Sequence, residues 1–237
     1  MAFRPIFVPG STKGALFKEV SVQFNWHRGM AASQKKKNVA ELHAEASFLG
    51  FGEILEVSTK SDSELGRRLS AFRLDVELSG ISSKIECIYQ ASKVFEKGGP
   101  FEEIVHLSPL EAKRYFKARK LGLIKCFSFK GQRYENLPFH AFYDWLFLRA
   151  LAEHKLFLSE RLSRFDAFSD IEFNPSKSIN TQARSVAIIA TLIKRDQLDA
   201  CASDFDFFRA HLEKIEKKTS TQIQLGLGSF EAEKSKK

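Results

Sequence analysis

The chain contains 237 residues, of which 43% are hydrophobic and 28% are charged, and its formal net charge at pH 7 is +8. This balance is that of a folded protein with a sizeable core, and no apolar run approaches the roughly 20 residues that a transmembrane helix needs. The positive charge favours a polyanionic or acidic partner such as DNA, RNA or an acidic protein.

Hydrophobic alternation and turn residues predict a small module of strands and helices in the first part of the chain. In chain order, the expected elements are an extended arm or loop over 1–13, a strand over 16–26, a helix from a Ser33 N-cap to about 49, a strand over 53–58, a helical turn with a Ser61 capping box over 61–68, and a half-exposed strand over 71–78.

The remainder of the chain is predicted to be mainly helical. The expected elements are a mostly buried helix over 83–95, a helix capped by Ser108, a strand over 124–129, a long core helix over 139–162, a carboxylate-rich loop over 166–175, a helix over 179–195 capped by Ser176 or Ser178, a helix over 204–215 and a tail over 217–237. The predicted fold class is therefore α+β, with a mainly helical core, a small N-terminal β-α-β-like module and short strands.

The expected domain organisation is an N-terminal extension over 1–68 packed on a core over 69–216, followed by a mobile basic tail over 217–237. Within that tail, Gln224 to Leu227 (QLGL) resembles the short peptide by which bacterial replication proteins bind the sliding clamp. The aromatic residue that should follow is displaced to Phe230, so a clamp contact is a minor hypothesis.

The N-terminus and the cysteines favour a cytoplasmic protein. The opening apolar stretch is too short for a signal peptide, and no small-residue cleavage site follows it. Cys87, Cys126 and Cys201 are odd in number, widely spaced and set among apolar residues, which is typical of reduced core thiols. Neither CxxC nor HxxxH spacing occurs, so we expect no metal site and no cofactor.

Residues 83–95 carry the strongest functional signal. On a helical wheel, Glu86, Gln90, Lys93 and Lys97 share one narrow stripe, while nearly every other side chain is apolar or small. Buried Glu and Lys are rare unless they are paired or face a cavity. Three interpretations remain open: an ion pair inside the core, a stripe that faces water, or a cleft wall that carries a carboxylate and an amine.

Five segments resemble motifs of the NADAR superfamily, in the superfamily's order along the chain. They are LSAF at 69–72 for its LSNF motif, IECIYQASKVF at 85–95 for its E-x-x-x-Q-x-x-K helix, SPLEAKR at 108–114 for S-P-x-E-A-K-R, FDAF at 165–168 for D-x-x-W-G, and Asn180 with Arg184 in the segment similar to G-K-N-x-L-G. The variant wording most resembles the NADAR antitoxins paired with DarT toxins, whereas the YbiA-like branch keeps LSNF and the Trp. Ala71 and Phe168 depart from the motifs, which puts sugar and base contacts there in doubt.

This resemblance implies an antitoxin of a DarT-type toxin–antitoxin system, active in phage defence, that hydrolyses the N-glycosidic bond between ADP-ribose and the guanine amino group of DNA. Single-stranded DNA is the expected substrate, because an exocyclic amine is more accessible there than in a duplex. ADP-ribose is the product, and the cognate toxin is a functional partner that the antitoxin also binds if neutralisation is direct. No membrane partner is expected.

The resemblance also implies roles for individual residues. Glu86 is the candidate general acid and base, Lys93 is either a nucleophile that opens the ribose to a Schiff base or a charge partner of Glu86, and Asp166 binds ribose hydroxyls or positions water. The candidate substrate-binding residues are Ser70, Phe72, Tyr89, Gln90, Lys113, Arg114, Asp170, Asn180 and Arg184.

Two other functions fit the same sequence. One is an N-glycosidase for a small ribosylated metabolite, such as an intermediate of riboflavin synthesis, as the YbiA-like branch implies. The other is a non-catalytic antitoxin that binds DNA or the toxin and neutralises by occupancy. The net positive charge and the N-terminal module argue mildly against the small-metabolite function.

Overall fold

The start of the chain forms a β-hairpin in the structure, a computed structural model that describes residues 1–29 and 31–212. β1 (Ala2–Pro9) pairs antiparallel with β2 (Phe17–Phe24), so the prediction of an arm or loop over 1–13 was wrong for most of that segment. Proline is uncommon inside strands because it has no N–H to donate to the ladder. β1 has a second neighbour only at Ile6 and Phe7, and the missing N–H groups of Pro5 and Pro9 fall outside that second ladder.

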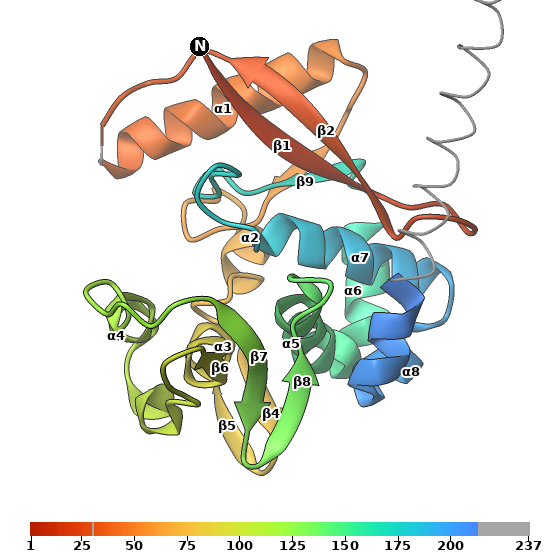
Figure 1. The fold of residues 1–237 in the computed structure, drawn as a ribbon. Helices are drawn as coiled ribbons and strands as arrows, with labels where there is room; N and C mark the ends of the chain where they lie inside the picture. Colours follow the sequence, from red (N-terminus) through yellow and green to blue (C-terminus); the bar gives the residue numbers. More distant parts are fainter. Residues whose placement is uncertain (30, 213–237) are drawn as a thin grey trace, which may run out of the picture.

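A four-stranded sheet in the order β2-β1-β9-β3 contains this hairpin. β3 (Ile54–Glu56) runs parallel to β9 (Ala167–Ser169), and α1 (Ala32–Phe48) lies along the hairpin (Figure 1). A small apolar cluster that includes Ile6 and Leu42 fills the space between helix and sheet. β9 comes from the segment predicted as a loop, and it joins the expected extension over 1–68 to the rest of the chain.

The predicted start signals of the first two helices were wrong. Ala31 is the N-cap of α1 rather than Ser33, and its carbonyl accepts the first backbone hydrogen bonds of the helix. Ser63 is the N-cap of α2 (Glu64–Arg68) rather than Ser61. Arg67 donates hydrogen bonds to the carbonyls of Ser61 and Asp62, which holds those two residues outside the helix.

The helix predicted over 83–95 is only partly helical. α3 (Ile85–Ala91) has seven residues, all buried, while β5 (Ile81–Lys84) precedes it and β6 (Lys93–Phe95) follows it. β5 pairs with β4 (Asp75–Leu78), and β6 pairs with β7 (Ile124–Phe129). Both ends of the predicted helix are therefore strands, because each end finds a hydrogen-bonding partner elsewhere in the chain.

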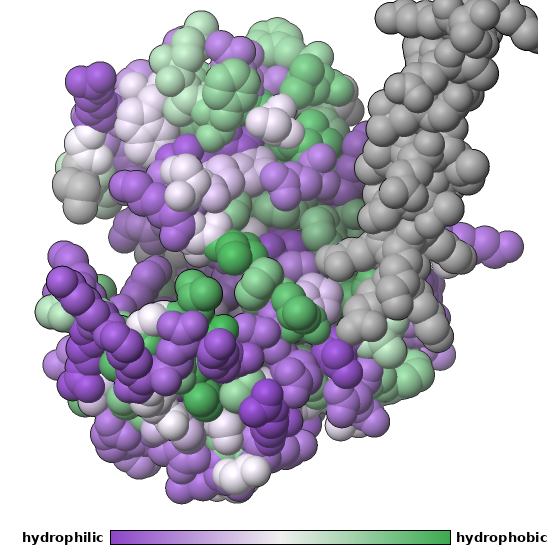
Figure 2. Space-filling view, viewed as in Figure 1, coloured by the Kyte–Doolittle hydropathy of each residue, from purple (hydrophilic) through white to green (hydrophobic). Residues whose placement is uncertain are grey.

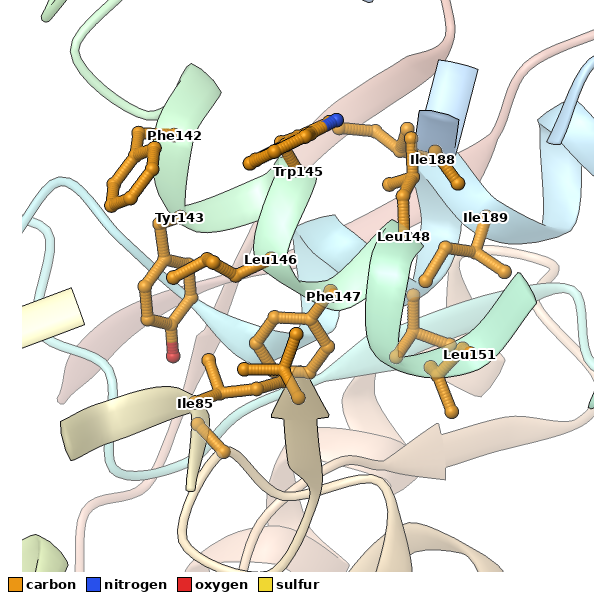
Figure 3. Close-up of a cluster of buried hydrophobic side chains, with 14 of the residues drawn as sticks. Ile85, Phe142, Tyr143, Trp145, Leu146, Phe147, Leu148, Leu151, Ile188 and Ile189 are labelled. Carbon is orange, nitrogen blue, oxygen red and sulfur yellow. The ribbon is translucent and has the colours of Figure 1, made fainter. Parts of the chain in front are cut away.

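The main core lies between α3 and two helices from the second half of the chain. Leu148 and Leu151 of α5 (Ala141–Leu151) face Ile188 and Ile189 of α7 (Gln182–Lys194), and Phe147 points toward the start of α3 (Figure 3). The long helix predicted over 139–162 is divided into α5, η2 (Ala152–His154) and α6 (Lys155–Leu162). The remaining elements are η1 (Glu102–His106), α4 (Pro109–Arg114), β8 (Gln132–Glu135), α8 (Leu198–Ser203) and a helical segment over 205–212.

Several local predictions are confirmed. Ser108 forms a capping box with Glu111 at the start of α4, β7 matches the predicted strand over 124–129, and all three cysteines are buried free thiols. The N-cap of α7 is Thr181 rather than Ser176 or Ser178. The fold class is α+β, as predicted.

Among the helices of the described residues, none is long and apolar enough to cross a membrane. The tail over 217–237, with its clamp-like peptide, lies outside the described residues.

Candidate functional site

A line of hydrogen-bonded polar side chains runs along one wall of a cleft of about 420 Å³. Gln90 Nε2 donates to Glu86 Oε1 at 2.9 Å, and Lys93 Nζ donates to Gln90 Oε1 at 2.7 Å. Glu86 and Gln90 lie on α3, and Lys93 is the first residue of β6. Of the three interpretations left open by the sequence, the cleft wall is therefore the one observed.

The surroundings of the Lys93 amine destabilise its protonated, charged form. Burial lowers the pKa of Lys93 from 10.5 to about 8, with Glu86 acting in the opposite direction and Lys113 adding to the lowering. Its Nζ lies 4.7 Å from the ring centroid of Tyr89 and 5.6 Å from that of Phe116. At pH 7.5 such a pKa leaves roughly a quarter of the amine neutral, whereas an ordinary lysine has almost none.

Glu86 is positioned by the turn that contains the LSAF motif. Its backbone N–H donates to the carbonyl of Ala71 at 3.2 Å. The N–H of Ala71 in turn donates to Gln182 Oε1 at 2.7 Å, and Gln182 is the first residue of α7. Ser70 is fully buried, and its hydroxyl accepts the N–H of Phe72 at 3.3 Å. Ser70 therefore stabilises this turn and does not line the cleft.

Asn180, from the segment before α7, and Tyr89, from α3, both line the cleft and contact each other. Asn180 Nδ2 donates to the Tyr89 hydroxyl at 2.7 Å, while Asn180 Oδ1 is buried and has no hydrogen-bond partner among the residues described. An unpaired amide oxygen is an acceptor that a hydroxyl of a bound sugar would satisfy after a small side-chain movement. The cleft thus contains the hydrogen-bonded line of Glu86, Gln90 and Lys93 and, in Asn180 Oδ1, an acceptor that is not yet used.

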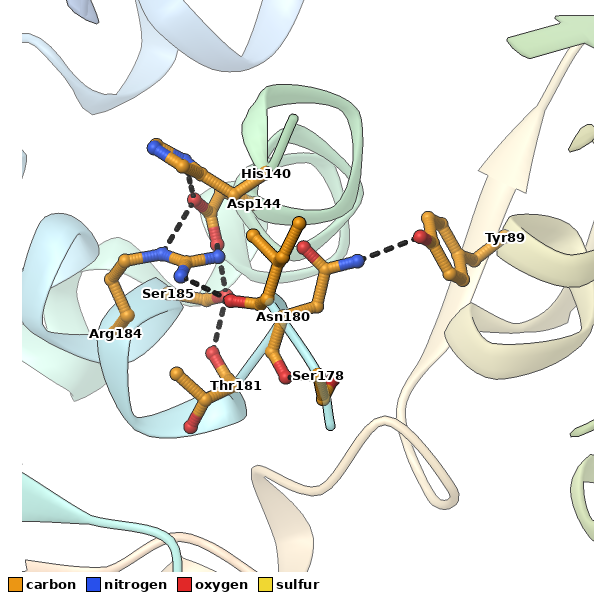
Figure 4. A network of polar contacts seen from close by, with 9 residues as sticks. Tyr89, His140, Asp144, Ser178, Asn180, Thr181, Arg184 and Ser185 are labelled. Carbon is orange, nitrogen blue, oxygen red and sulfur yellow. Dashed lines mark hydrogen bonds and ion pairs between the residues drawn. The ribbon is translucent and has the colours of Figure 1, made fainter. Parts of the chain in front are cut away.

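Arg184 supports the segment that carries Asn180. Its Nη1 donates to the carbonyl of Ile179 at 2.7 Å, and its Nε donates to Asp144 Oδ2 at 3.1 Å (Figure 4). Both Arg184 and Asp144 are buried. Burial alone would raise the pKa of Asp144, but Arg184 and the hydrogen bonds from His140 and Ser185 hold it below its ordinary value. The guanidinium of Arg184, a candidate substrate-binding group, is therefore engaged inside the protein.

The family of the chain follows from comparison with known proteins. A family model of DarT1-associated NADAR antitoxins matches residues 2–222. The chain belongs to this family. Its role is accordingly that of an antitoxin in a toxin–antitoxin pair, with a DarT toxin as its cognate partner. A comparison with the curated proteins finds no match.

In this NADAR antitoxin, the two predicted aspartates lie outside the cleft. Asp166 is exposed, and its Oδ2 accepts the backbone N–H of Gly52 at 2.8 Å. Asp170 is buried and accepts hydrogen bonds from Thr181 Oγ1 at 3.2 Å and Gln182 Nε2 at 3.3 Å. Burial raises the pKa of Asp170. Through Gln182, Asp170 is linked to the turn that positions Glu86.

Three of the candidate substrate-binding residues of the NADAR antitoxin line a second hollow of about 750 Å³. Phe72, Lys113 and Arg114 all contribute to it, and Lys113 also lines the cleft of Glu86. Lys113 Nζ lies 5.4 Å from the ring centroid of Phe72. The structure therefore divides six of the nine predicted substrate-binding residues between two adjoining hollows that share Lys113, while Ser70, Asp170 and Arg184 line neither hollow.

Sequence reasoning missed two residues of the site. Tyr143 lines the cleft, and its ring lies edge-on to that of Tyr89 with the two ring centroids 5.1 Å apart. Burial, with Glu86 as a smaller cause, raises the pKa of Tyr143 well above the ordinary value. It was hidden in the apolar run of α5. Gln182 had no signal beyond its place at the start of a helix. Within the described part of the chain, no group of three His, Cys, Asp or Glu side chains is arranged to hold a metal ion.

Proposed function

We propose that this antitoxin removes ADP-ribose from the guanine amino group of DNA by hydrolysing the N-glycosidic bond. The observation that supports this most is the line formed by Glu86, Gln90 and Lys93, in which a carboxylate and a partly neutral amine share one cleft wall. Cleavage of such a bond needs a proton for the departing amine and a group to capture the ribose carbon C1. The cleft offers both.

In the proposed reaction, Glu86 acts as general acid and base and Lys93 as the nucleophile. The ribose first opens: the C1–O4′ bond breaks, and a proton moves from the guanine nitrogen to O4′, which leaves a C1=N bond to guanine. Neutral Lys93 adds to C1, and Glu86 transfers the two protons that the amine loses to the guanine nitrogen. The bond from C1 to that nitrogen then breaks, and a Schiff base between C1 and Lys93 remains. Water then hydrolyses the resulting Schiff base, which releases ADP-ribose and restores Lys93. One water molecule is consumed, and DNA with an unmodified guanine is the other product.

The position of Gln90 explains how Glu86 and Lys93 can act in the same reaction. A carboxylate in direct contact with Lys93 would keep the amine charged and unreactive. Gln90 lies between them and bonds to each, and Lys93 makes no ion pair among the residues that the structure describes. Asn180 and Tyr89 are then proposed to bind ribose hydroxyls. Asp166, which lies outside the cleft, has no part in this reaction.

An oligonucleotide that carries ADP-ribose on one guanine tests the proposal. The wild type should release unmodified DNA, while Glu86→Gln and Lys93→Ala should not, with melting temperatures close to that of the wild type. The exposed residues Lys97 and Glu19 provide matched controls, and Lys97→Ala and Glu19→Gln should retain activity.

Other outcomes select the other functions. Full release by both cleft variants would reject this site. Tight binding without release by the wild type would support an antitoxin that acts by occupancy. Neither binding nor release would favour a small ribosylated substrate.

A further inference from the structure

The second hollow is lined by an excess of positive charge. Its five cationic residues come from separate parts of the chain and outnumber a single carboxylate, that of Glu172. They are Lys35, Lys60, Lys113, Arg114 and Lys117. None of the five forms an ion pair with another described residue, and three of them are exposed. A group of unpaired cations around one hollow creates a positive potential that attracts a polyanion.

Two aromatic rings stand among these cations. Phe72 and Phe116 both line the hollow and are half-buried. Lys113 lies over the ring of Phe72, and Lys93 of the cleft lies over the ring of Phe116. Phe116 and Lys113 thus connect the hollow directly to the candidate reaction centre. Partly accessible aromatic rings beside cations are a combination by which proteins bind single-stranded nucleic acid, since bases stack on the rings while phosphates meet the cations.

The hollow lies between two parts of the molecule. Lys35 belongs to α1, in the upper part of Figure 1, while Lys113 and Arg114 belong to α4, in the lower part. Figure 2 shows a notch between these parts, bordered by hydrophilic residues. A hollow that opens to solvent between two parts of the molecule can admit a chain that continues beyond the site.

We propose that this hollow binds the single strand of DNA next to the modified guanine, with its phosphates on the five cations and a neighbouring base on Phe72. The proposal rests on the proposed function, because a guanine placed at Glu86 and Lys93 must be followed by its own strand. The pyrophosphate of ADP-ribose offers the same phosphate chemistry. Its two phosphates need only a compact site, whereas these cations are spread over α1, the loop after β3 and the region of α4.

Affinity for an unmodified single-stranded oligonucleotide, measured by fluorescence anisotropy, isolates this surface from the chemistry. The double variant Lys60→Glu/Lys117→Glu should weaken binding by roughly tenfold or more at 0.1 M salt and reduce the slope of log affinity against log salt. Phe72→Ala should weaken binding by about tenfold, as expected for the loss of one stacked base. A duplex of the same sequence should bind more weakly than the single strand.

A matched control comes from a different groove. Arg161 and Arg164 line a hollow of about 970 Å³ that shares no residue with the other two, and both are exposed. Arg161→Glu/Arg164→Glu changes the net charge by the same amount as the double lysine variant. It should change oligonucleotide affinity by less than about twofold if binding is local.

Three results would overturn the proposal. They are an equal loss of affinity in the arginine control, a duplex that binds as well as the single strand, and a lysine variant that loses affinity for free ADP-ribose but not for the oligonucleotide. The last result would assign the hollow to the pyrophosphate. Because the oligonucleotide is unmodified, its binding is measured without cleavage. Failure of the hydrolysis test would leave this result standing, and failure here would leave the hydrolysis test standing.

Discussion

Lys93 donates its hydrogen bond to the side-chain carbonyl of Gln90, at 2.7 Å, and not to the carboxylate of Glu86. A neutral acceptor satisfies the amine without fixing its charge, so burial can lower its pKa. The same Gln90 side chain uses its N–H to hold Glu86. One amide thus orients the proposed acid–base group and the proposed nucleophile while keeping them apart.

The first prediction concerns pH. Because the pKa of Lys93 is lowered to about 8, its neutral form increases as pH rises through that value, and kcat/KM should increase over the same interval. Gln90→Glu places a second carboxylate against the amine, which raises its pKa. The rising limb should then move to higher pH, and activity at pH 7.5 should fall by about tenfold.

Gln90→Met is the control for that variant, because it removes the hydrogen bond without adding charge. Its rising limb should stay at or below that of the wild type. A wild-type profile that is flat or falls between pH 7 and 9 would contradict a neutral Lys93 and would favour a charge partner of Glu86.

The second prediction separates the two roles of Lys93 directly. Lys93→Arg keeps a positive charge that cannot be removed near neutral pH, so it should lose about a hundredfold or more in kcat if Lys93 is a nucleophile. Cyanoborohydride added during turnover should reduce the Schiff base and leave ADP-ribose bonded to Lys93, detectable by peptide mass spectrometry. Substantial activity of Lys93→Arg together with no trapped adduct would exclude the nucleophile.

Local sequence patterns predicted which side chains meet in the candidate site better than they predicted the helices and strands that carry them. The spacing of Glu86, Gln90 and Lys93 identified the three side chains that meet, although the helix that was to align them ends at Ala91. Lys93 reaches Gln90 from β6, whose position is fixed by pairing with β7. Pairing between distant segments leaves no local periodic signal. The helical wheel therefore placed these three side chains together correctly, although Lys93 belongs to a strand and not to the predicted helix.

The direction in which a side chain points was harder to predict than which residues lie near one another. Arg184 lies four residues after Asn180, as expected for neighbours at the start of a helix, but its side chain turns inward to Asp144 on α5. Asp166 belongs to a motif segment and yet bonds to the backbone of Gly52 at the surface. Both outcomes depend on elements brought together from elsewhere in the chain, and residue spacing carries no information about them.

The third prediction concerns the buried pair of Arg184 and Asp144. Arg184→Met leaves the Asp144 carboxylate buried without its guanidinium, which should cost about 3–5 kcal/mol of unfolding free energy at pH 7. The pKa of Asp144 is lowered in the native protein, so the pair contributes stability above the ordinary carboxyl range and loses it as pH falls. In Arg184→Met the burial of Asp144 is no longer opposed by the guanidinium, so its pKa should rise and the carboxyl should take up a proton as pH falls. The deficit of the variant should therefore shrink between pH 7 and pH 4 in urea unfolding.

The double variant Asp144→Leu/Arg184→Met tests whether this deficit comes from an unpaired charge. It should lose less than the sum of the two single changes, since it leaves no isolated charge buried. An Arg184→Met protein as stable as the wild type at pH 7 would show that the pair contributes nothing to the native state.

The last prediction concerns Glu56, a buried residue of β3. Its oxygens accept hydrogen bonds from Ser58 Oγ and Ser169 Oγ at 2.6 Å and from the N–H of Ile171 at 2.9 Å. Burial nevertheless raises the pKa of Glu56 to about 7, with nearby Asp170 adding to the shift. Between the ordinary carboxyl range and pH 7, the native protein therefore binds more protons at this site than the unfolded chain does.

Glu56 should thus stabilise the protein at acidic pH and lose that contribution as pH rises toward 7. Glu56→Gln cannot ionise, so its unfolding free energy relative to the wild type should improve steadily from pH 4.5 to pH 7.5 in urea titrations. Glu19→Gln, at an exposed position of β2, should show a constant difference over the same range. A constant difference for Glu56→Gln as well would mean that this carboxyl titrates alike in the folded and unfolded chains, in spite of its burial.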